Sequence, residues 1–215
     1  DLSRNLTRYF GTDISMIVRT SEGIGFSHYL FPHGKQEGAE IEFAALDADS
    51  TLNFLLKYEE KLKPDDSAYI QVALLYTNPF GERLIRVINY GVKVANNLWD
   101  FYISTDGEAT SQLMIKMHGL ELGERMVKSI RYDLIEHVVD IIYHYRCLFH
   151  KRIKKIEILP SNMENLPLYV FSALKSPMLK TTGGATIDDR FYGLIRFMCT
   201  PLHILSTWLY PKVFA

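Results

Sequence analysis

Cysteine is scarce in this sequence. Only Cys147 and Cys199 occur among 215 residues, and they have no C-x-x-C spacing. Two cysteines cannot form a disulfide framework and do not suggest a zinc site, so we expect a cytosolic protein. Long apolar runs are also missing: none approaches the roughly 18 residues needed to span a membrane, and residues 1–10 lack the pattern of a signal peptide. Neither a membrane-spanning nor a secreted protein is expected.

An excess of charge of one sign is absent as well. The 24 lysines and arginines nearly balance the 25 aspartates and glutamates, which leaves a net charge of -1. We therefore expect no nucleic-acid partner. One local run is basic, and its cations are Lys151, Arg152, Lys154 and Lys155. Two interpretations fit this run: it complements the negative end of the preceding helix dipole, or it forms a membrane-facing patch that contacts acidic lipid headgroups.

Signals of enzyme chemistry are missing too. The sequence has no glycine-rich phosphate loop, no H-E-x-x-H zinc helix and no G-x-S-x-G nucleophile elbow. We therefore predict that the chain is not an enzyme and holds no cofactor.

The first part of the chain, up to about residue 94, alternates apolar and polar residues with a period of two, which predicts strands. The alternating segments are 14–18, 24–29, 40–43 and 52–58. The clearest hairpin joins 70–76 to 83–87, with Asn78-Pro79-Phe80 interpreted as part of its turn. Because such sheets bury one face, we expect an antiparallel β-sandwich domain over residues 1–95, which can take further strands from upstream chain.

After residue 94 the period changes to 3.6, which predicts an all-helical domain over residues 96–215. A short apolar segment at 98–103 is followed by a helix that Asp106 can cap. The longest helix should run from about Gly123 to His150. Its expected apolar stripe is Met126, Ile130, Leu134, Val138, Ile141, Tyr145 and Leu148. Two further helices are expected over 166–175 and 188–198, the second capped by Asp188. The fold class is thus an α+β multidomain protein.

One set of possible metal ligands lies on the predicted long helix: His137, Asp140, His144 and Cys147. Their spacing puts them on one stripe. However, they would spread over about 15 Å of helix axis, whereas ligands lie roughly 2 Å from a single ion. Two of them could share a metal and four could not. The favoured interpretation is a partly buried polar edge of the helix, and a metal-dependent hydrolase is the alternative.

The hairpin sequence 71–77, together with 83–87, resembles the cargo-selecting adaptor subunit of the COPII vesicle coat. Other similar segments occur in the family's order on both sides of the hairpin. The upstream ones are 6–8, Gly11, 18–21, Gly23 and 33–34, and the downstream ones are 104–106, 166–169, 173–176, 189–190 and 210–211. The resemblance covers nearly the whole chain, and its specificity comes from the number of elements in register.

This resemblance implies that the chain is the sandwich and helical portion of an inner-coat adaptor that captures cargo export signals at the endoplasmic reticulum. In that family a zinc finger and a trunk lie upstream and a gelsolin-like domain lies downstream, so zinc is expected only in an upstream domain. The implied partners are the GTPase-activating inner-coat subunit, bound through the trunk, the cytosolic tails of cargo proteins, and an acidic membrane surface. The implied location is cytoplasmic, peripheral on the endoplasmic reticulum membrane and on coated vesicles.

The resemblance also implies a pocket for acidic export signals, with Arg19 and Leu75 at the family's positions. A guanidinium can bind a carboxylate through two hydrogen bonds, and the leucine would contact apolar residues of the signal. Relatives can carry a second arginine two residues earlier, where this chain has Ile17. Taken by themselves, Leu75 fits a core position and Arg19 an exposed strand charge.

A second function remains open, the paralogous GTPase-activating subunit of the same coat, which supplies an arginine to a small GTPase. The stretches Leu166-Pro167-Leu168-Tyr169 and 71–75 favour the adaptor.

Overall fold

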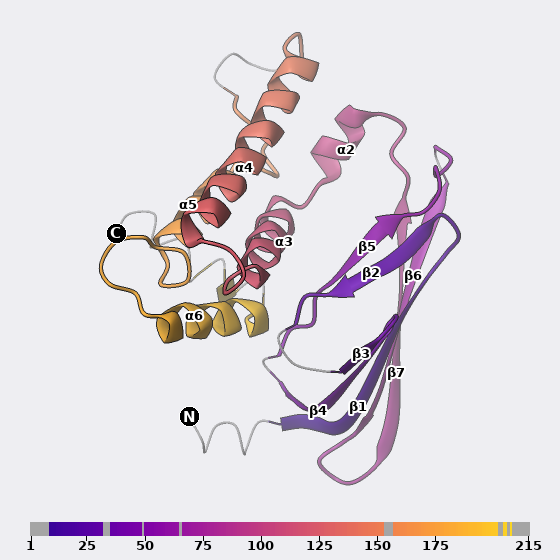
Figure 1. Cartoon of the computed structure of the whole chain (residues 1–215). Helices are drawn as coiled ribbons and strands as arrows, with labels where there is room; N and C mark the ends of the chain where they lie inside the picture. The colour runs from indigo at the N-terminus through magenta and orange to yellow at the C-terminus, as the bar shows by residue number, and fades with distance from the viewer. Residues whose placement is uncertain are drawn as a thin grey trace. The chain divides into compact units, whose positions relative to one another are not determined.

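A computed structural model describes residues 9–31, 35–48, 50–64, 66–152, 157–201, 204–205 and 207. The chain divides into two compact units, Asp1–Asn96 and Asn97–Ala215. Strands make up the described structure of the first unit and helices that of the second (Figure 1). The predicted fold class, an antiparallel β-sheet domain followed by a helical domain, is confirmed.

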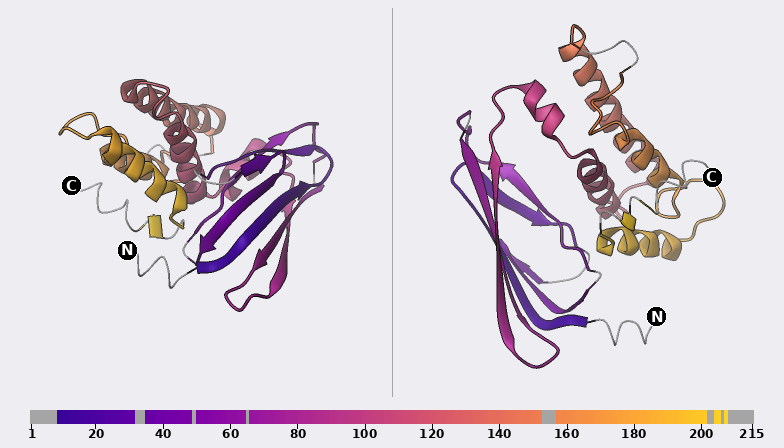
Figure 2. Two further views of the ribbon diagram at one scale, coloured as in Figure 1. Left: turned by 60° about the horizontal axis from the view of Figure 1, so that its bottom comes forward. Right: turned by 180° about the vertical axis from the view of Figure 1, so that it is seen from behind.

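The first unit contains two antiparallel sheets. Its strands are β1 (Tyr9–Thr20), β2 (Ile24–Tyr29), β3 (Lys35–Glu37), β4 (Glu40–Asp47), β5 (Phe54–Tyr58), β6 (Ser67–Thr77) and β7 (Arg83–Lys93). Five strands pair in the order β3-β4-β1-β6-β7, and β2 pairs with β5. The two-stranded sheet lies over one face of the larger one (Figure 2), and Tyr29 and Phe54 pack there against a core that includes Ile14, Met16 and Ile41.

The hairpin between β6 and β7 is the most regular part of this unit. All eleven residues of β6 pair with β7, from Ser67 opposite Lys93 to Thr77 opposite Arg83. Asn78 closes the turn, because its side-chain Oδ1 accepts hydrogen bonds from the backbone N–H groups of Phe80 and Glu82, each at 2.9 Å. The interpretation of Asn78-Pro79-Phe80 as a turn is therefore confirmed.

One strand was not predicted. The three residues of β3, Lys35–Glu37, are all exposed and polar, so they lack the apolar alternation on which strand prediction depends. Pairing with β4, which itself buries Ile41 and Phe43, makes this segment a strand.

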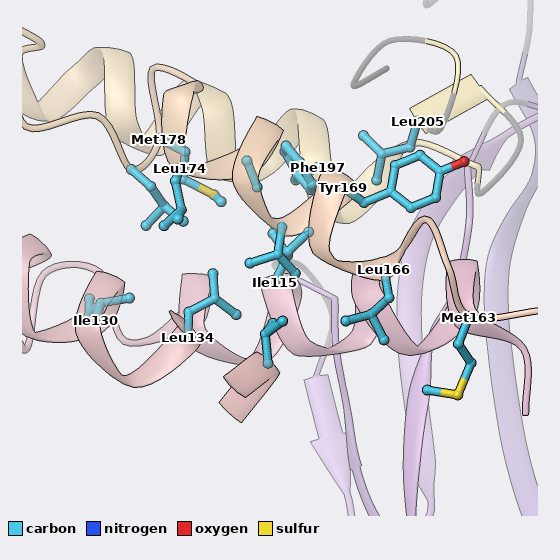
Figure 3. Close-up of a cluster of buried hydrophobic side chains, with 14 of the residues drawn as sticks. Ile115, Ile130, Leu134, Met163, Leu166, Tyr169, Leu174, Met178, Phe197 and Leu205 are labelled. Carbon is cyan, nitrogen blue, oxygen red and sulfur yellow. The ribbon is translucent and has the colours of Figure 1, made fainter. Parts of the chain in front are cut away.

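The second unit is formed by α2 (Leu98–Ser104), α3 (Gly107–Leu120), α4 (Val127–Phe149), α5 (Leu166–Lys175) and α6 (Ile187–Cys199). Its core lies between these helices, where the side chains of Ile115, Leu134, Leu174 and Phe197 point toward one another (Figure 3). Within the described ranges, none of the helices combines the length and apolar character that crossing a bilayer requires.

The stripe predicted for α4 is correct in its centre and wrong at its ends. Ile130, Leu134 and Tyr145 are fully buried, but Met126 is 77% exposed and Leu148 is 51% exposed. Met126 has extended backbone and precedes the helix, so it does not share the buried face. At the other end Phe149, four residues after Tyr145, takes the inward position in place of Leu148.

The helix caps also separate one correct prediction from one error. Asp106 caps α3, accepting the N–H of Ala109 at 3.0 Å, as predicted. Asp188 does not cap α6. Thr186 does, because its hydroxyl accepts the N–H of Asp189 at 3.1 Å while the Asp189 carboxylate accepts the N–H of Thr186 at 2.9 Å. This reciprocal capping box starts the helix at Ile187.

Candidate functional site

The face of the large sheet that points away from the core is defined by the strand register. Ile14, Met16 and Val18 of β1 point into the core, so the odd-numbered residues of β1 and β6 point to the opposite, outer face. Three cross-strand rows lie side by side there. The rows are Ser15–Leu75–Ile85, Ile17–Ala73–Val87 and Arg19–Gln71–Asn89. On β6 and β7 the first two rows are apolar, and the third is polar. On β4, Glu42 and Glu40 continue the first two rows with exposed carboxylates.

We name Ile17, Ala73, Leu75, Ile85 and Val87 the outer apolar patch. Leu75 is 36% exposed, Val87 48% and Ile85 66%. Leu75 is therefore not a core residue, which corrects the reading of that position as ordinary sandwich core. Contiguous apolar side chains on an otherwise polar face are typical of a binding surface.

Arg19 stands beside this patch, in the polar row. It is exposed and has no carboxylate partner within the described part of the chain. Next to it the Gln71 amide donates to Asn89 Oδ1 at 2.8 Å. Arg19 pairs with Gln71, four residues from Leu75, so the two predicted site residues are about 14 Å apart along the strand at ~3.4 Å per residue. They share a face without touching, and Ile17 and Ala73 lie between them.

The opposite end of the face carries a second arginine, which sequence reasoning missed. Arg83 Nη1 lies 2.8 Å from Asp13 Oδ2 and 3.1 Å from Thr77 Oγ1, and it also donates to the backbone carbonyl of Asp13. Asp13 has a left-handed backbone, with φ of 49°, where the register of β1 shifts. Asp13 thus neutralises Arg83, whereas Arg19 has no carboxylate partner among the described residues. No local pattern marks Arg83, because the contact joins residues 70 positions apart.

The hollow beside Arg83 has a volume of about 420 Å³. Its lining includes Asp13, Lys35, Glu42 and Arg83, so acidic and basic groups face it together. Lys35 Nζ is 2.8 Å from Glu37 Oε1, which reduces its availability to a ligand. The net charge of the hollow is therefore close to zero. An acidic ligand would meet less positive charge here than beside Arg19.

The basic run that follows α4 is described only in part. Lys151 and Arg152 are exposed, and the Arg152 guanidinium carbon lies 5.7 Å from the centroid of the Trp99 ring. Lys154 and Lys155 lie outside the described residues.

The possible metal ligands of α4 do not converge. His137, Asp140, His144 and Cys147 are all exposed, so the expectation of a partly buried polar edge is wrong. His137 Nδ1 instead lies 2.9 Å from Nε2 of His118 on α3, a buried imidazole whose pKa is lowered by burial. Among the residues that the structure describes, no group of three or more histidine, cysteine or acidic side chains could hold a metal ion.

The fold and this surface define a class of protein: a β-sandwich unit joined to a helical unit, with an exposed apolar and cationic surface on the sheet. Comparison with known families agrees. The Sec23/Sec24 beta-sandwich domain matches residues 11–95, and the Sec23/Sec24 helical domain matches residues 106–207. The chain belongs to the Sec23/Sec24 family.

Several relatives of this chain are Sec24 proteins. It is 30% identical over 217 residues to the human protein transport protein Sec24C, covering 99% of this chain and 20% of that protein. It is 31% identical over 219 residues to protein transport protein SEC24 B of Arabidopsis thaliana, covering 100% and 20%. The SED5-binding protein 3 of Saccharomyces cerevisiae is 28% identical over 214 residues, with 99% and 23% covered. The chain spans about a fifth of the length of these curated relatives.

A solved structure has the same fold. The crystal structure of the human COPII-coat protein Sec24c matches with a TM-score of 0.87 and 29% identity, over 97% of this chain and 28% of that one. The sandwich and helical domains are therefore of the Sec24 type.

Proposed function

We propose that this chain is the sandwich and helical part of a COPII coat adaptor that captures cargo export signals for transport from the endoplasmic reticulum to the Golgi. The observation that carries the proposal is the match of both domains to the human COPII-coat protein Sec24c over 97% of the chain. The chain acts as a binding scaffold, without chemistry of its own. The GTPase-activating alternative is not favoured, because two of the relatives described above, from human and Arabidopsis thaliana, are named as Sec24 proteins.

The rest of such an adaptor lies outside this chain. A zinc finger and a trunk precede these domains, with zinc held only in that upstream part, and a gelsolin-like domain follows them. The GTPase-activating inner-coat subunit binds through the trunk. The protein is cytoplasmic and peripheral on the endoplasmic reticulum membrane, where the basic run of Lys151, Arg152, Lys154 and Lys155 contacts acidic headgroups.

The outer apolar patch and Arg19 form the cargo-signal site. An extended peptide that runs along the sheet places an apolar side chain on Leu75 and Ile85 and a carboxylate near Arg19, about four residues further along. Arg19 lacks a carboxylate partner within the described residues, so it can form a charge-assisted bond with the signal. Ile17 extends the apolar part of the site where relatives can have a second arginine. This site therefore favours signals with one acidic residue and several apolar ones.

The test uses the full-length protein and an acidic di-leucine peptide, with affinity measured by fluorescence anisotropy. Arg19→Ala should weaken binding about tenfold or more, the value of one hydrogen bond to a charged group. Leu75→Trp should weaken it similarly by obstructing the patch. Arg86→Ala is the matched control, since Arg86 is exposed on β7 opposite Leu74, on the other face of the sheet. Unchanged affinity in both test variants would reject this site and leave the family assignment standing.

A further inference from the structure

A second hollow lies in the helical unit and is lined by residues from the start of α2 and the end of α4. Its volume is about 370 Å³, at the low end of ligand pockets and suited to one or two side chains. It is lined by Asn97, Leu98, Trp99, Leu148, Phe149 and Arg152. These residues belong to one compact unit, so the hollow does not depend on how the two units are placed.

Two of the six lining residues, Trp99 and Phe149, are aromatic, and both pack with the core. The Trp99 ring packs edge-on against Phe149, with 5.1 Å between centroids and 76° between planes, and it stacks on Tyr145 at 6.5 Å and 20°. Tyr145 is fully buried and Phe149 is 9% exposed, so Trp99 rests on a rigid base. Leu98 and Leu148 are 54% and 51% exposed. An aromatic side chain entering here would meet ring edges and faces in the geometry that aromatic pairs prefer.

Arg152 is the one charged side chain among the six that line the hollow, and it lies over the Trp99 ring at 5.7 Å. At this distance the guanidinium can make a cation–π contact with the ring, and its N–H groups can still donate to a carboxylate. It has no carboxylate partner in the described part of the molecule. The other polar side chain, Asn97, is engaged with α2: it accepts the N–H of Asp100 at 3.0 Å and donates to Asp100 Oδ2 at 2.8 Å.

The charge around the hollow favours an acidic ligand. Lys151, which precedes Arg152, is also exposed. The chain as a whole has a net charge of -1, so this cluster is a local feature. One of the two interpretations of this run from the sequence is that it complements the negative end of the α4 dipole. That role does not require Arg152 to lie over Trp99.

We propose that this hollow, which we name the Trp99 pocket, binds an extended acidic peptide segment by enclosing one aromatic side chain against Trp99 and Phe149 and pairing a neighbouring carboxylate with Arg152. A peptide fits the concave shape better than a lipid surface does. A peptide can insert one projecting side chain into the hollow, whereas the surface of a bilayer has no such projecting group. The proposal is independent of the site on the sheet, which lies on the other compact unit.

The experiment uses the 215-residue chain and a fluorescein-labelled peptide, Gly-Ser-Glu-Phe-Glu-Glu-Ser-Gly, with binding measured by fluorescence anisotropy. We expect saturable binding that is lost when the phenylalanine of the peptide is replaced by serine. Arg152→Gln should weaken binding about tenfold, the effect of one charge-assisted hydrogen bond, and Leu148→Ser should weaken it several-fold. Both residues are exposed, so both variants should fold, as circular dichroism can verify.

The controls use matched residues elsewhere on the surface. Lys128→Gln removes an exposed cation from the other end of α4, and Tyr132→Ser removes an exposed apolar side chain from the same helix, so neither should change the affinity. Binding that survives Arg152→Gln, or no saturable binding, would overturn the proposal. Binding that Arg19→Ala weakens would assign the peptide to the sheet instead. If sedimentation with phosphatidylserine vesicles depends on Arg152 and Leu148 while peptide binding does not, the hollow is a membrane contact and the proposal is wrong.

Discussion

Lys116 on α3 has a charged group inside the helical core. The residue is 1% exposed, and its Nζ donates to the backbone carbonyl of Met198 at 3.3 Å. Burial lowers the pKa of this lysine from 10.5 to about 8. The charged form is therefore less stable inside the protein than in the unfolded chain, and this residue opposes folding at neutral pH.

The pH dependence of this effect has a definite sign. Below about pH 8 the lysine is charged in both states, and the folded state bears the full cost. Between about 8 and 10.5 the unfolded chain binds more protons, so the free energy of unfolding rises with pH. Lys116→Met should therefore be more stable than the parent at pH 7, by up to roughly 3 kcal/mol, and the difference should shrink toward pH 10.

Urea unfolding at pH 7, 8.5 and 10, followed by circular dichroism, measures this difference. Lys128→Met serves as the control, because Lys128 is exposed and its substitution should have a small, pH-independent effect. A stability difference for Lys116→Met that stays constant across this range would contradict the assignment.

The start of α6 depends on two residues that act together. The Thr186 hydroxyl and the Asp189 carboxylate each accept a backbone N–H of the other, and the Asp189 carboxylate also accepts the Thr186 hydroxyl at 2.8 Å. Hydrogen bonds from Thr186 hold the pKa of Asp189 below its ordinary value. This contribution to stability is present at neutral pH and is lost as the pH falls through that lowered pKa.

Thr186→Ala should lower the stability of the helical unit by about 1 kcal/mol, the usual value of an N-cap. Asp188→Ala is the matched comparison, since Asp188 is an exposed acidic residue in the same first turn that makes no cap bond. It should cost only a few tenths of a kcal/mol, through the helix dipole. Thermal unfolding at pH 7 distinguishes the two, and equal effects would mean that the capping box is not what stabilises α6.

At the scale of the elements, the bounds of a strand or helix could be predicted best where the apolar residues follow a clear period. β2 and α5 have the predicted bounds, 24–29 and 166–175, because apolar spacing and turn residues mark both ends. β7 is longer than predicted, reaching Lys93, since pairing with β6 continues through residues with no clear alternation. The predicted cap of α6, Asp188, is wrong because Thr186, Asp188 and Asp189 are all residue types that cap helices well. Only the backbone conformation shows that Thr186 is the N-cap.

At the scale of the whole molecule, β7 is an edge strand, and among the described residues it pairs with β6 on one side only. It ends the large sheet, and all eleven of its residues are exposed. Ile85 and Val87 are exposed on the outer face, and Ile88 is 52% and Tyr90 66% exposed on the inner side. Long apolar edges promote association between chains. Because the curated relatives are about five times longer, we propose that strands from upstream chain complete the sandwich here.

Ile88→Lys should reduce self-association of the 215-residue chain, because a charge at an exposed edge position opposes pairing between strands. Static light scattering over a range of concentrations measures this. Tyr132→Lys adds the same charge to α4 at a residue that is 65% exposed, and it should have a weaker effect. Equal effects of the two substitutions would indicate general charge repulsion and would remove the edge explanation.

The sequence by itself determined the two-part architecture and most elements, because periodicity and turn chemistry are local properties of the chain. Arg19 and Leu75, the two residues proposed for the sheet site, were suggested by the resemblance to the adaptor family. Only the tertiary structure decided which side chains share a surface. The contact of Arg83 with Asp13, the four-residue offset between Arg19 and Leu75, and the position of Arg152 over the Trp99 ring depend on strand register and helix packing. These contacts join positions far apart in the chain, so no local pattern could reveal them.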